Sequence, residues 1–179
     1  MREVADAERI WRFMRALGTE AQASTRVYFT GGATAVLLGW RASTIDVDMK
    51  MVPDTDRLFR AIPRLKESLH INVELASPSD FVPVRAGWED RSPFIAQEGR
   101  IAFHHFDLYA QALAKAERSH LQDVEDVREM LKRGLVNAAN AWEYFELIRP
   151  QCYRYPALDA RAFEQAVVEI FGPRSAGSR

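Results

Sequence analysis

The stretch VYFTGGATAVLLGWRASTIDVDMKM, residues 27–51, decides how this chain folds. Its β-branched and aromatic start belongs to a strand over 26–30, and a pair of glycines follows as a turn. A short apolar helix is predicted over 33–38 and a second strand over 45–52. Strand, glycine turn, helix and strand together predict an α+β layer.

The second strand carries two aspartates one residue apart, Asp46 and Asp48. Residues i and i+2 of a strand point to the same face, so the two carboxylates are expected side by side. Two carboxylates held together repel each other unless a cation or a shared proton offsets the repulsion. The pair therefore predicts a site for a hard divalent ion with oxygen ligands, Mg²⁺ or Mn²⁺.

The composition of the chain indicates a globular protein but does not indicate a partner. The chain has 179 residues, is 47% hydrophobic and 27% charged, and carries a formal net charge of −1. These values are typical of a globular protein, and they exclude a global positive field, so a nucleic acid would have to bind at a local patch. No apolar run approaches the roughly 20 residues that span a bilayer, and the N-terminus lacks the pattern of a signal peptide. The single cysteine, Cys152, cannot form an intrachain disulfide, which suits the reducing cytoplasm where we expect the protein to act.

Outward from the central stretch, helical and alternating patterns predict the remaining elements. The N-terminal helix is expected over 3–18, with Gly18 as its end. The other predicted elements are a helix over 55–69 that contains Pro63, a strand over 71–76, a loop over 77–92, hairpin strands over 94–97 and 100–104, and helices over 108–116, 121–135, 138–148 and 159–171. We therefore expect a core over 1–105, a helical subdomain over 106–172 and a disordered tail over 173–179.

The glycine pair is a candidate phosphate site. Gly31 and Gly32 precede a helix directly, so a ligand can approach their backbone closely and the first amides of the helix can face an anion. The alternative interpretation is a tight turn with no ligand. A phosphate cradle beside a divalent-metal site is what phosphoryl or nucleotidyl transfer requires, so the aspartates on the next strand favour the functional interpretation.

Glu74 is the candidate third carboxylate. It lies on the predicted strand over 71–76, on the face opposite Ile71, Val73 and Leu75. A neighbouring strand would bring it beside the aspartates, where it would act as a base or as a metal ligand for an attacking hydroxyl. The alternative is a solvent-facing glutamate in a salt bridge.

Together these residues resemble the DNA polymerase β-like nucleotidyltransferase superfamily, and most of all its AbiEii-like branch, which includes toxins of toxin–antitoxin systems. The resemblance implies a nucleotidyltransferase-like mixed sheet with flanking helices and a C-terminal helical bundle. It implies that the glycine pair binds the triphosphate of an NTP such as ATP, and that Asp46, Asp48 and Glu74 bind Mg²⁺ or Mn²⁺ and serve catalysis. One departure is Gly32, because the superfamily often has a serine there; Thr30 and Thr34 are the candidate replacements for its hydroxyl.

The resemblance extends more loosely to Lys115 and Arg118, followed by Asp123 and Asp126. Comparable residues of AbiEii-like proteins close over the nucleotide, so Lys115 and Arg118 are expected to neutralise its phosphates. Three residues apart on one helix face, the two cations are equally suited to pair with the two aspartates.

The remaining polar candidates are weaker. Arg41 and Thr44 are expected to brace the carboxylates or contact phosphate; the alternative is a turn with an exposed arginine. His104 and His105 are adjacent on a strand and point to opposite faces, which argues against a shared metal ion.

The sequence thus predicts a metal-dependent enzyme that moves a nucleoside monophosphate from an NTP to a hydroxyl of an RNA, such as tRNA, or of a protein, with a cognate toxin or antitoxin as a further partner and no membrane. A second hypothesis is an inactive nucleotidyltransferase-fold binding module, an antitoxin or a nucleotide sensor. A metal-dependent nuclease that uses the same carboxylates ranks third.

Overall fold

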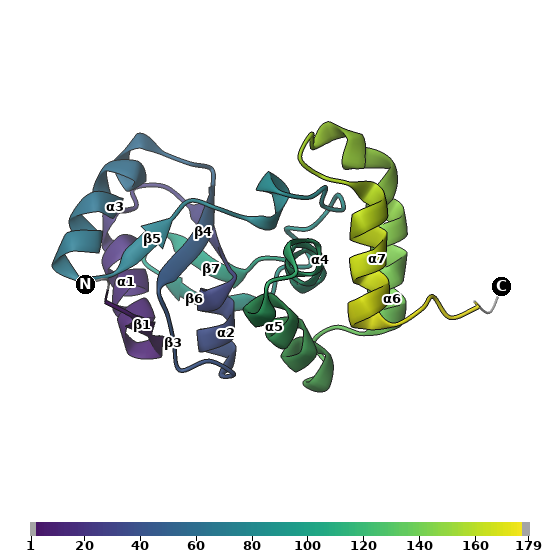
Figure 1. Cartoon of the computed structure of the whole chain (residues 1–179). Coiled ribbons are helices and arrows are strands. Elements are labelled where there is room, and N and C mark those ends of the chain that lie inside the picture. The colour runs from purple at the N-terminus through teal and green to yellow at the C-terminus, as the bar shows by residue number, and fades with distance from the viewer. Residues whose placement is uncertain (1–2, 177–179) are drawn as a thin grey trace. The chain divides into compact units, whose positions relative to one another are not determined.

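A computed structural model describes residues 3–176 of the chain (Figure 1). The chain divides into two compact units, one formed by Met1–Ser77 with Ser92–Phe106 and the other by Pro78–Arg91 with Asp107–Arg179. The segment 78–91, which the sequence predicts as a loop, therefore belongs with the helical part of the chain.

The first unit is built on a five-stranded mixed sheet with the strand order β5-β4-β2-β7-β6. The strands are β2 (Thr25–Thr30), β4 (Asp46–Val52), β5 (Asn72–Glu74), β6 (Phe94–Glu98) and β7 (Ile101–His105). The β2–β7 and β4–β5 pairs are parallel, and the β2–β4 and β6–β7 pairs are antiparallel. Two short strands, β1 (Ala5–Asp6) and β3 (Ser43–Thr44), form a separate antiparallel pair.

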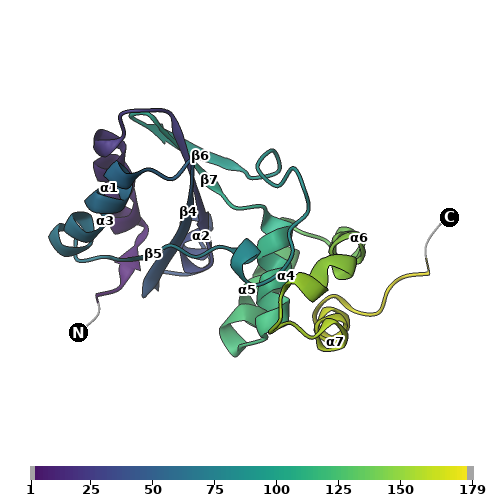
Figure 2. The ribbon, with the colours of Figure 1, turned by 90° about the horizontal axis from the view of Figure 1, so that it is seen from above.

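Helices cover one face of this sheet. They are α1 (Ala7–Glu20), α2 (Gly32–Leu38) and α3 (Asp56–Ser68), and Figure 2 shows α1 and α3 side by side. Their apolar residues pack with every second residue of the strands, including the stacked rings of Phe29 and Phe103, 5.6 Å apart between centroids. The opposite face of the sheet carries the alternate residues, among them both aspartates of β4.

The N-terminal helix differs from the sequence prediction at both ends. It begins after β1 and runs past Gly18, which lies inside α1 and is fully buried. A Cβ at residue 18 would lie 2.6 Å from the carbonyl oxygen of Glu98, at the turn between β6 and β7. Glycine is therefore present for close helix–sheet packing rather than to end the helix.

Two other elements show how tertiary context changes local patterns. The helix predicted over 55–69 forms as α3 and is continuous through Pro63, with Leu58, Ala61 and Leu65 on its buried face. β5 is shorter than the predicted strand over 71–76, because only its middle residues pair with β4.

The second unit is helical. It comprises α4 (Leu108–Arg118), α5 (Leu121–Lys132), α6 (Ala138–Ile148), α7 (Ala160–Phe171) and the 3₁₀ helices η1 (Pro78–Asp80) and η2 (Arg149–Arg154). Aromatic rings fill its core, with Phe145 edge-on to Phe163 at 5.0 Å. The segment 78–91 is fixed to this unit, since Arg91 donates to buried Asp107 at 3.0 Å and Tyr155 donates to the Ser79 carbonyl at 2.7 Å.

The α+β class with a mixed sheet, flanking helices and a C-terminal helical part is thus confirmed. The four C-terminal helices also form where helical periodicity predicts them. Of the predicted tail, 177–179 lie outside the described residues, and 173–176 form no helix or strand.

Candidate functional site

β4 presents its two aspartates on one face, as its alternation predicts. Val47 and Met49 are fully buried, whereas Asp46 and Asp48 on the other face are only partly buried. The difference in burial arises because the helices cover only the face that carries Val47 and Met49. Both carboxylates thus lie on the face that the three helices leave uncovered.

The register of β5 brings Glu74 next to this pair. Asp46 is the Cα partner of Asn72, and Asp48 is the Cα partner of Glu74. Partner residues on adjacent strands project to the same face of a sheet. Three carboxylates and one amide therefore share one surface at the β5 side of the sheet.

Asn72 connects two of these carboxylates directly. Its Nδ2 donates to Asp46 Oδ1 at 2.5 Å and to Glu74 Oε1 at 3.3 Å. Asn72 is not among the residues that the sequence predicts for the site, because the sequence pattern marks it only as a polar position in an alternating strand. The signal that would have found it is the register between β4 and β5, which no local pattern encodes.

The glycine turn lies against the same carboxylates. Gly31 has a φ of +62° and a ψ of −129°, a combination that side-chain-bearing residues strongly disfavour. A Cβ on Gly31 would lie 3.1 Å from Asp48 Oδ2. The structure therefore brings the candidate phosphate loop and the candidate metal ligands together.

Gly32 is required by the residues that follow the short helix. A Cβ at residue 32 would lie 2.7 Å from the Cβ of Thr44 and 3.3 Å from Nη1 of Arg41, and it would overlap the Thr44 hydroxyl. That hydroxyl donates to the carbonyl oxygen of Asp46 at 2.9 Å. Thr44 thus contacts both the glycine turn and the aspartate strand, and it explains why a larger residue does not fit at position 32.

A buried histidine lies on the other side of the turn. The Oγ1 of Thr34 lies 3.0 Å from Nδ1 of His105, and both side chains are almost fully buried. Burial, reinforced by the charge of His104, lowers the pKa of His105 to about 4, so His105 is neutral at physiological pH. The Thr34 hydroxyl is therefore part of the internal packing beneath the turn.

His104 points to the opposite face, as predicted for adjacent strand residues. Its ring lies 5.4 Å from the ring of Tyr28, and its Nδ1 lies 3.0 Å from the carbonyl oxygen of Ser92. The two histidines accordingly have separate surroundings, which agrees with the argument against a shared metal ion.

In the second unit, Lys115 and Arg118 are paired with aspartates. Lys115 Nζ lies 2.7 Å from Asp126 Oδ2 and 3.5 Å from Asp123 Oδ1. Arg118 grips Asp123 with two bonds, from Nε at 2.7 Å and from Nη2 at 2.6 Å. The Lys115 and Asp126 side chains are 8% and 0% exposed, so this is a buried ion pair, whereas the Arg118 side chain is 58% exposed.

Asp123 also joins the two helices at their connection. It accepts a hydrogen bond from the backbone amide of His120 at 3.3 Å, within the capping box that begins α5. Burial opposes the ionisation of Asp123, but the hydrogen bond from Arg118 and the charges of Lys115 and Arg118 outweigh it and hold the pKa below its usual value. Asp123 is therefore ionised in the folded protein at neutral pH.

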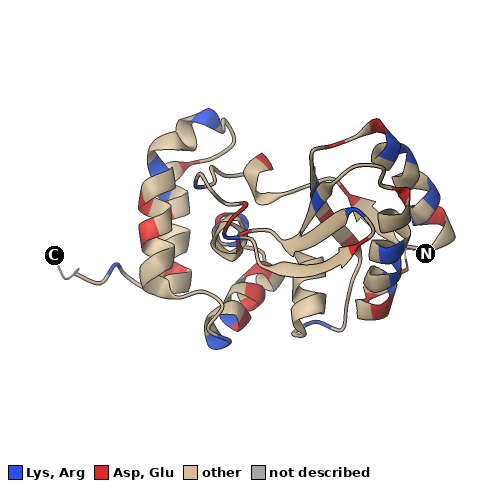
Figure 3. Ribbon diagram, turned by 180° about the vertical axis from the view of Figure 1, so that it is seen from behind, with Lys and Arg blue, Asp and Glu red and all other residues tan. Residues whose placement is uncertain are grey.

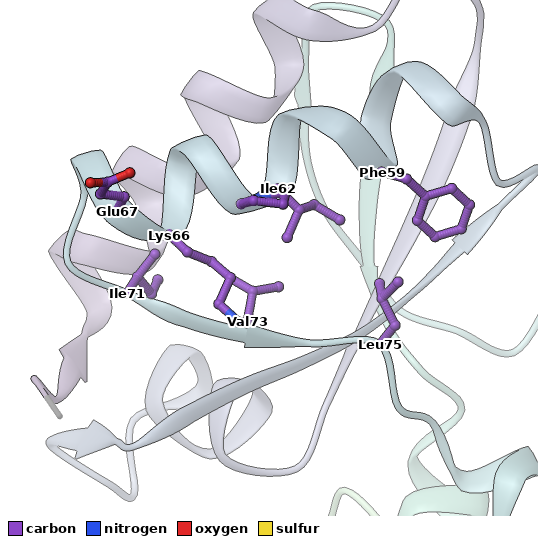
Figure 4. Close-up of a pocket in the computed structure, with 8 residues that line it drawn as sticks. Phe59, Ile62, Lys66, Glu67, Ile71, Val73 and Leu75 are labelled. Carbon is purple, nitrogen blue, oxygen red and sulfur yellow. The ribbon is translucent and has the colours of Figure 1, made fainter.

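Away from these clusters, the described surface includes an apolar groove. A groove of about 600 Å³ lies between α3 and β5, lined by apolar residues that include Ile71, Val73 and Leu75 (Figure 4). Val73 points away from the face that carries Asn72 and Glu74, so the groove is separate from the carboxylates. Figure 3 shows basic and acidic residues mixed on α1 and α3, rather than a surface of one sign.

Between residues 3 and 176, no three His, Cys, Asp or Glu side chains are arranged to hold a metal ion by themselves. Over the same range, none of the helices has both the length and the apolarity that a membrane crossing demands.

The sequence-predicted residues thus fall into two groups. Gly31, Gly32, Arg41, Thr44, Asp46, Asp48 and Glu74 belong to the first unit, where the contacts given above connect them into one cluster. Lys115 and Arg118 belong to the second unit, where both are engaged in ion pairs.

Comparison with known proteins supplies the family. No curated protein and no solved structure matched the chain. A family model described as "Nucleotidyltransferase of unknown function (DUF6036)" matches residues 7–169. The match includes the glycine turn, the three carboxylates and the ion-paired helices, and it supports the superfamily that the motif resembles. The chain therefore belongs to this family of nucleotidyltransferases of unknown function.

Proposed function

We propose that the protein is a Mg²⁺- or Mn²⁺-dependent nucleotidyltransferase that transfers a nucleoside monophosphate from an NTP to a hydroxyl group of an RNA, such as tRNA, or of a protein. One observation carries the proposal: the glycine turn approaches the carboxylate of Asp48 so closely that a Cβ on Gly31 would lie 3.1 Å from Oδ2. The turn proposed to hold the triphosphate and a carboxylate proposed to hold its metal ion are thus adjacent.

The donor set fits a hard divalent ion. Mg²⁺ in phosphoryl-transfer sites is usually held by one or two carboxylates, with water and substrate phosphates completing its six oxygens. Asp46 and Asp48 supply two carboxylates on one face, and Glu74 lies on the neighbouring strand. Such a site needs no closed cage of three protein ligands, which agrees with the absence of one among residues 3–176. When bound, the ion would neutralise phosphate charge and lower the pKa of the acceptor hydroxyl.

The proposed reaction is a displacement at the α-phosphorus of the NTP. The acceptor oxygen attacks the α-phosphorus of the NTP, the bond between that phosphorus and the bridging α–β oxygen breaks, and pyrophosphate leaves. Glu74 takes the proton of the acceptor hydroxyl, because it lies beside Asp48 and is exposed to an incoming substrate. Gly31 and Gly32 hold the β- and γ-phosphates through backbone amides. Arg41 and Thr44 lie next to Gly32 and support the turn there.

Further parts of the proposal extend beyond this face. Lys115 and Arg118 would offset phosphate charge, Arg118 with its more exposed guanidinium. The resemblance to AbiEii-like proteins suggests a cytoplasmic toxin–antitoxin component with a cognate partner protein. Neighbouring genes offer an independent check, since a toxin is expected beside a small partner gene.

Label transfer tests the reaction. Each of the four α-³²P NTPs would be incubated with the full chain, Mg²⁺ or Mn²⁺, and total cellular RNA and protein. We expect transfer from at least one nucleotide, and its loss in the double variant Asp46→Asn/Asp48→Asn. The matched control is Asp54→Asn/Asp56→Asn, which removes the same two charges at exposed positions before α3 and at its start.

The double variant should fold normally, because it removes two like charges from one face. Undiminished transfer by the Asp46→Asn/Asp48→Asn protein would overturn the site assignment. Absence of transfer by folded wild-type protein, with every nucleotide and both ions, would overturn the proposed enzyme activity and favour the binding module.

A further inference from the structure

The neutral side chain of Asn72 is hydrogen-bonded to two of the candidate carboxylates. We propose that Asn72 is a positioning residue that orients Asp46 to bind the divalent ion and Glu74 to take the proton of the acceptor hydroxyl; this inference rests on the proposed function. Its Nδ2 donates to Asp46 Oδ1 and to Glu74 Oε1, across the parallel β4–β5 pair.

The chemistry of the contacts fixes the orientation of the amide. Both partners are carboxylates, which only accept hydrogen bonds when ionised, so the NH₂ group and not the oxygen of Asn72 must face them. The two hydrogen bonds engage one oxygen of Asp46 and one of Glu74. They restrict the rotation of both side chains, and the second oxygen of each carboxylate is not used by the amide.

The backbone around Asn72 holds the amide in place. Ile71 and Val73 on either side are 3% and 4% exposed and belong to the core, so the side chain between them must project to the carboxylate face. The amide of Ile71 donates to the carbonyl oxygen of Lys66 at the end of α3, 3.1 Å away. The strand can therefore rotate little without disrupting the core.

A neutral donor suits this position better than a charged one. A lysine or arginine between two carboxylates would neutralise them and compete with a metal ion, as a structural ion pair does. A carboxylate would add a third like charge to those of Asp46 and Glu74. Asparagine orients the two groups and preserves the negative charge that attracts a cation.

Manganese binding by the full chain provides the test. The free Mn²⁺ signal in electron paramagnetic resonance would be titrated for wild type, Asn72→Ala, Asn72→Lys and Asp46→Asn/Asp48→Asn, with and without NTP. Residues that hydrogen-bond to the ligands of a metal ion typically contribute about 10- to 100-fold to the metal affinity. We expect Asn72→Ala to weaken Mn²⁺ binding by about 10-fold, and Asn72→Lys to weaken it more. Asn140→Ala, an exposed asparagine on α6, is the control and should bind as wild type.

A second measurement distinguishes a positioning role of Asn72 from general damage to the structure. In the transfer assay, Asn72→Ala should raise the Mg²⁺ concentration needed for half-maximal rate by about 10-fold, and saturating Mg²⁺ should recover most of the rate. Circular dichroism should show an unchanged fold, because Asn72 is only partly buried.

The possible failures are distinguishable. Mn²⁺ binding by Asn72→Ala within twofold of wild type, while Asp46→Asn/Asp48→Asn loses it, overturns the positioning role and leaves the proposed function standing. Wild-type binding by Asp46→Asn/Asp48→Asn, or no Mn²⁺ binding by folded wild type with or without NTP, overturns the proposed metal site and the role of Asn72 with it.

Discussion

The molecule contains two clusters of carboxylates that differ in what balances their charge. On the sheet, Asp46 and Glu74 accept hydrogen bonds from the neutral amide of Asn72 on a partly exposed face. Between α4 and α5, Asp123 and Asp126 are buried and paired with the cations of Arg118 and Lys115. One cluster keeps its negative charge at the surface, and the other cancels it internally.

The difference separates two uses of the same chemical group. A buried carboxylate must be paired, because the cost of removing an isolated ion from water is several kcal/mol. A partly exposed carboxylate remains in contact with water, so it needs no paired cation within the protein. It can therefore bind a cation that arrives with a substrate. Loss of a single charge should therefore lower stability more in the helical cluster than in the sheet cluster.

The largest expected effect on stability is at Lys115. Replacing Lys115 by Met leaves Asp126 buried without its cation, which should lower the free energy of unfolding by about 3–5 kcal/mol. Asp46→Asn should not lower it. Urea denaturation followed by circular dichroism measures both variants.

The control for that experiment removes both charges. Lys115→Met/Asp126→Leu should recover most of the lost stability, since no uncompensated charge remains. If Lys115→Met unfolds at the same urea concentration as wild type, the contrast between the two clusters fails.

The next effect concerns packing on the sheet side. Gly32→Ala should cost about 1–3 kcal/mol, because the new Cβ overlaps Thr44. A second substitution, Thr44→Gly, removes the obstructing atoms, so the double variant should be less destabilised than the sum of the two single variants. Strict additivity in this double-mutant cycle would show that Thr44 does not explain the glycine at 32.

The smallest effect is a pH dependence from His105. The folded pKa of about 4 lies below the ordinary value of 6.5, so the unfolded chain binds the proton more readily. The contribution of His105 to stability is complete at neutral pH and is lost as the pH falls from 6.5 toward 4. Between pH 7 and pH 5.5 the loss should be about 1 kcal/mol, measured by urea denaturation.

Two variants test the origin of that slope. His105→Asn should flatten it, because the titrating group is gone. Thr34→Val removes the hydroxyl beside Nδ1 but keeps the ring buried, and burial is the main cause of the shift. The Thr34→Val protein should therefore keep the slope, and a flattened profile would assign the effect to the hydrogen bond instead.

Local sequence patterns were sufficient to predict β2, α2, β4 and β5, but not the short strand β3 that carries Thr44. Alternation placed Asp46 and Asp48 on one face, and the glycine pair marked the turn, since both signals depend only on neighbours in the chain. Helical periodicity likewise located the four C-terminal helices.

The remaining features depend on contacts between distant residues. Gly18 resembles a helix stop, and only its contact with Glu98 explains why the helix continues. The β4–β5 register places Asn72 beside its hydrogen-bond partners. The Thr34 hydroxyl lies beside His105 only because the folded chain brings these distant residues together. The pairing of Lys115 with Asp126 was one of two alternatives that helical spacing allowed.

The order of the strands in the sheet has a consequence for synthesis on the ribosome. Central β2 pairs with β4 on one side and with β7 on the other, and Thr25 meets Ile101 only after the segment 78–91 has emerged. The nascent chain thus contains the glycine turn and all three carboxylates while one side of β2 still lacks its neighbour. During that interval the apolar ring of Phe29 lacks its stacking partner Phe103, and the unpaired edge of β2 is exposed to misassociation.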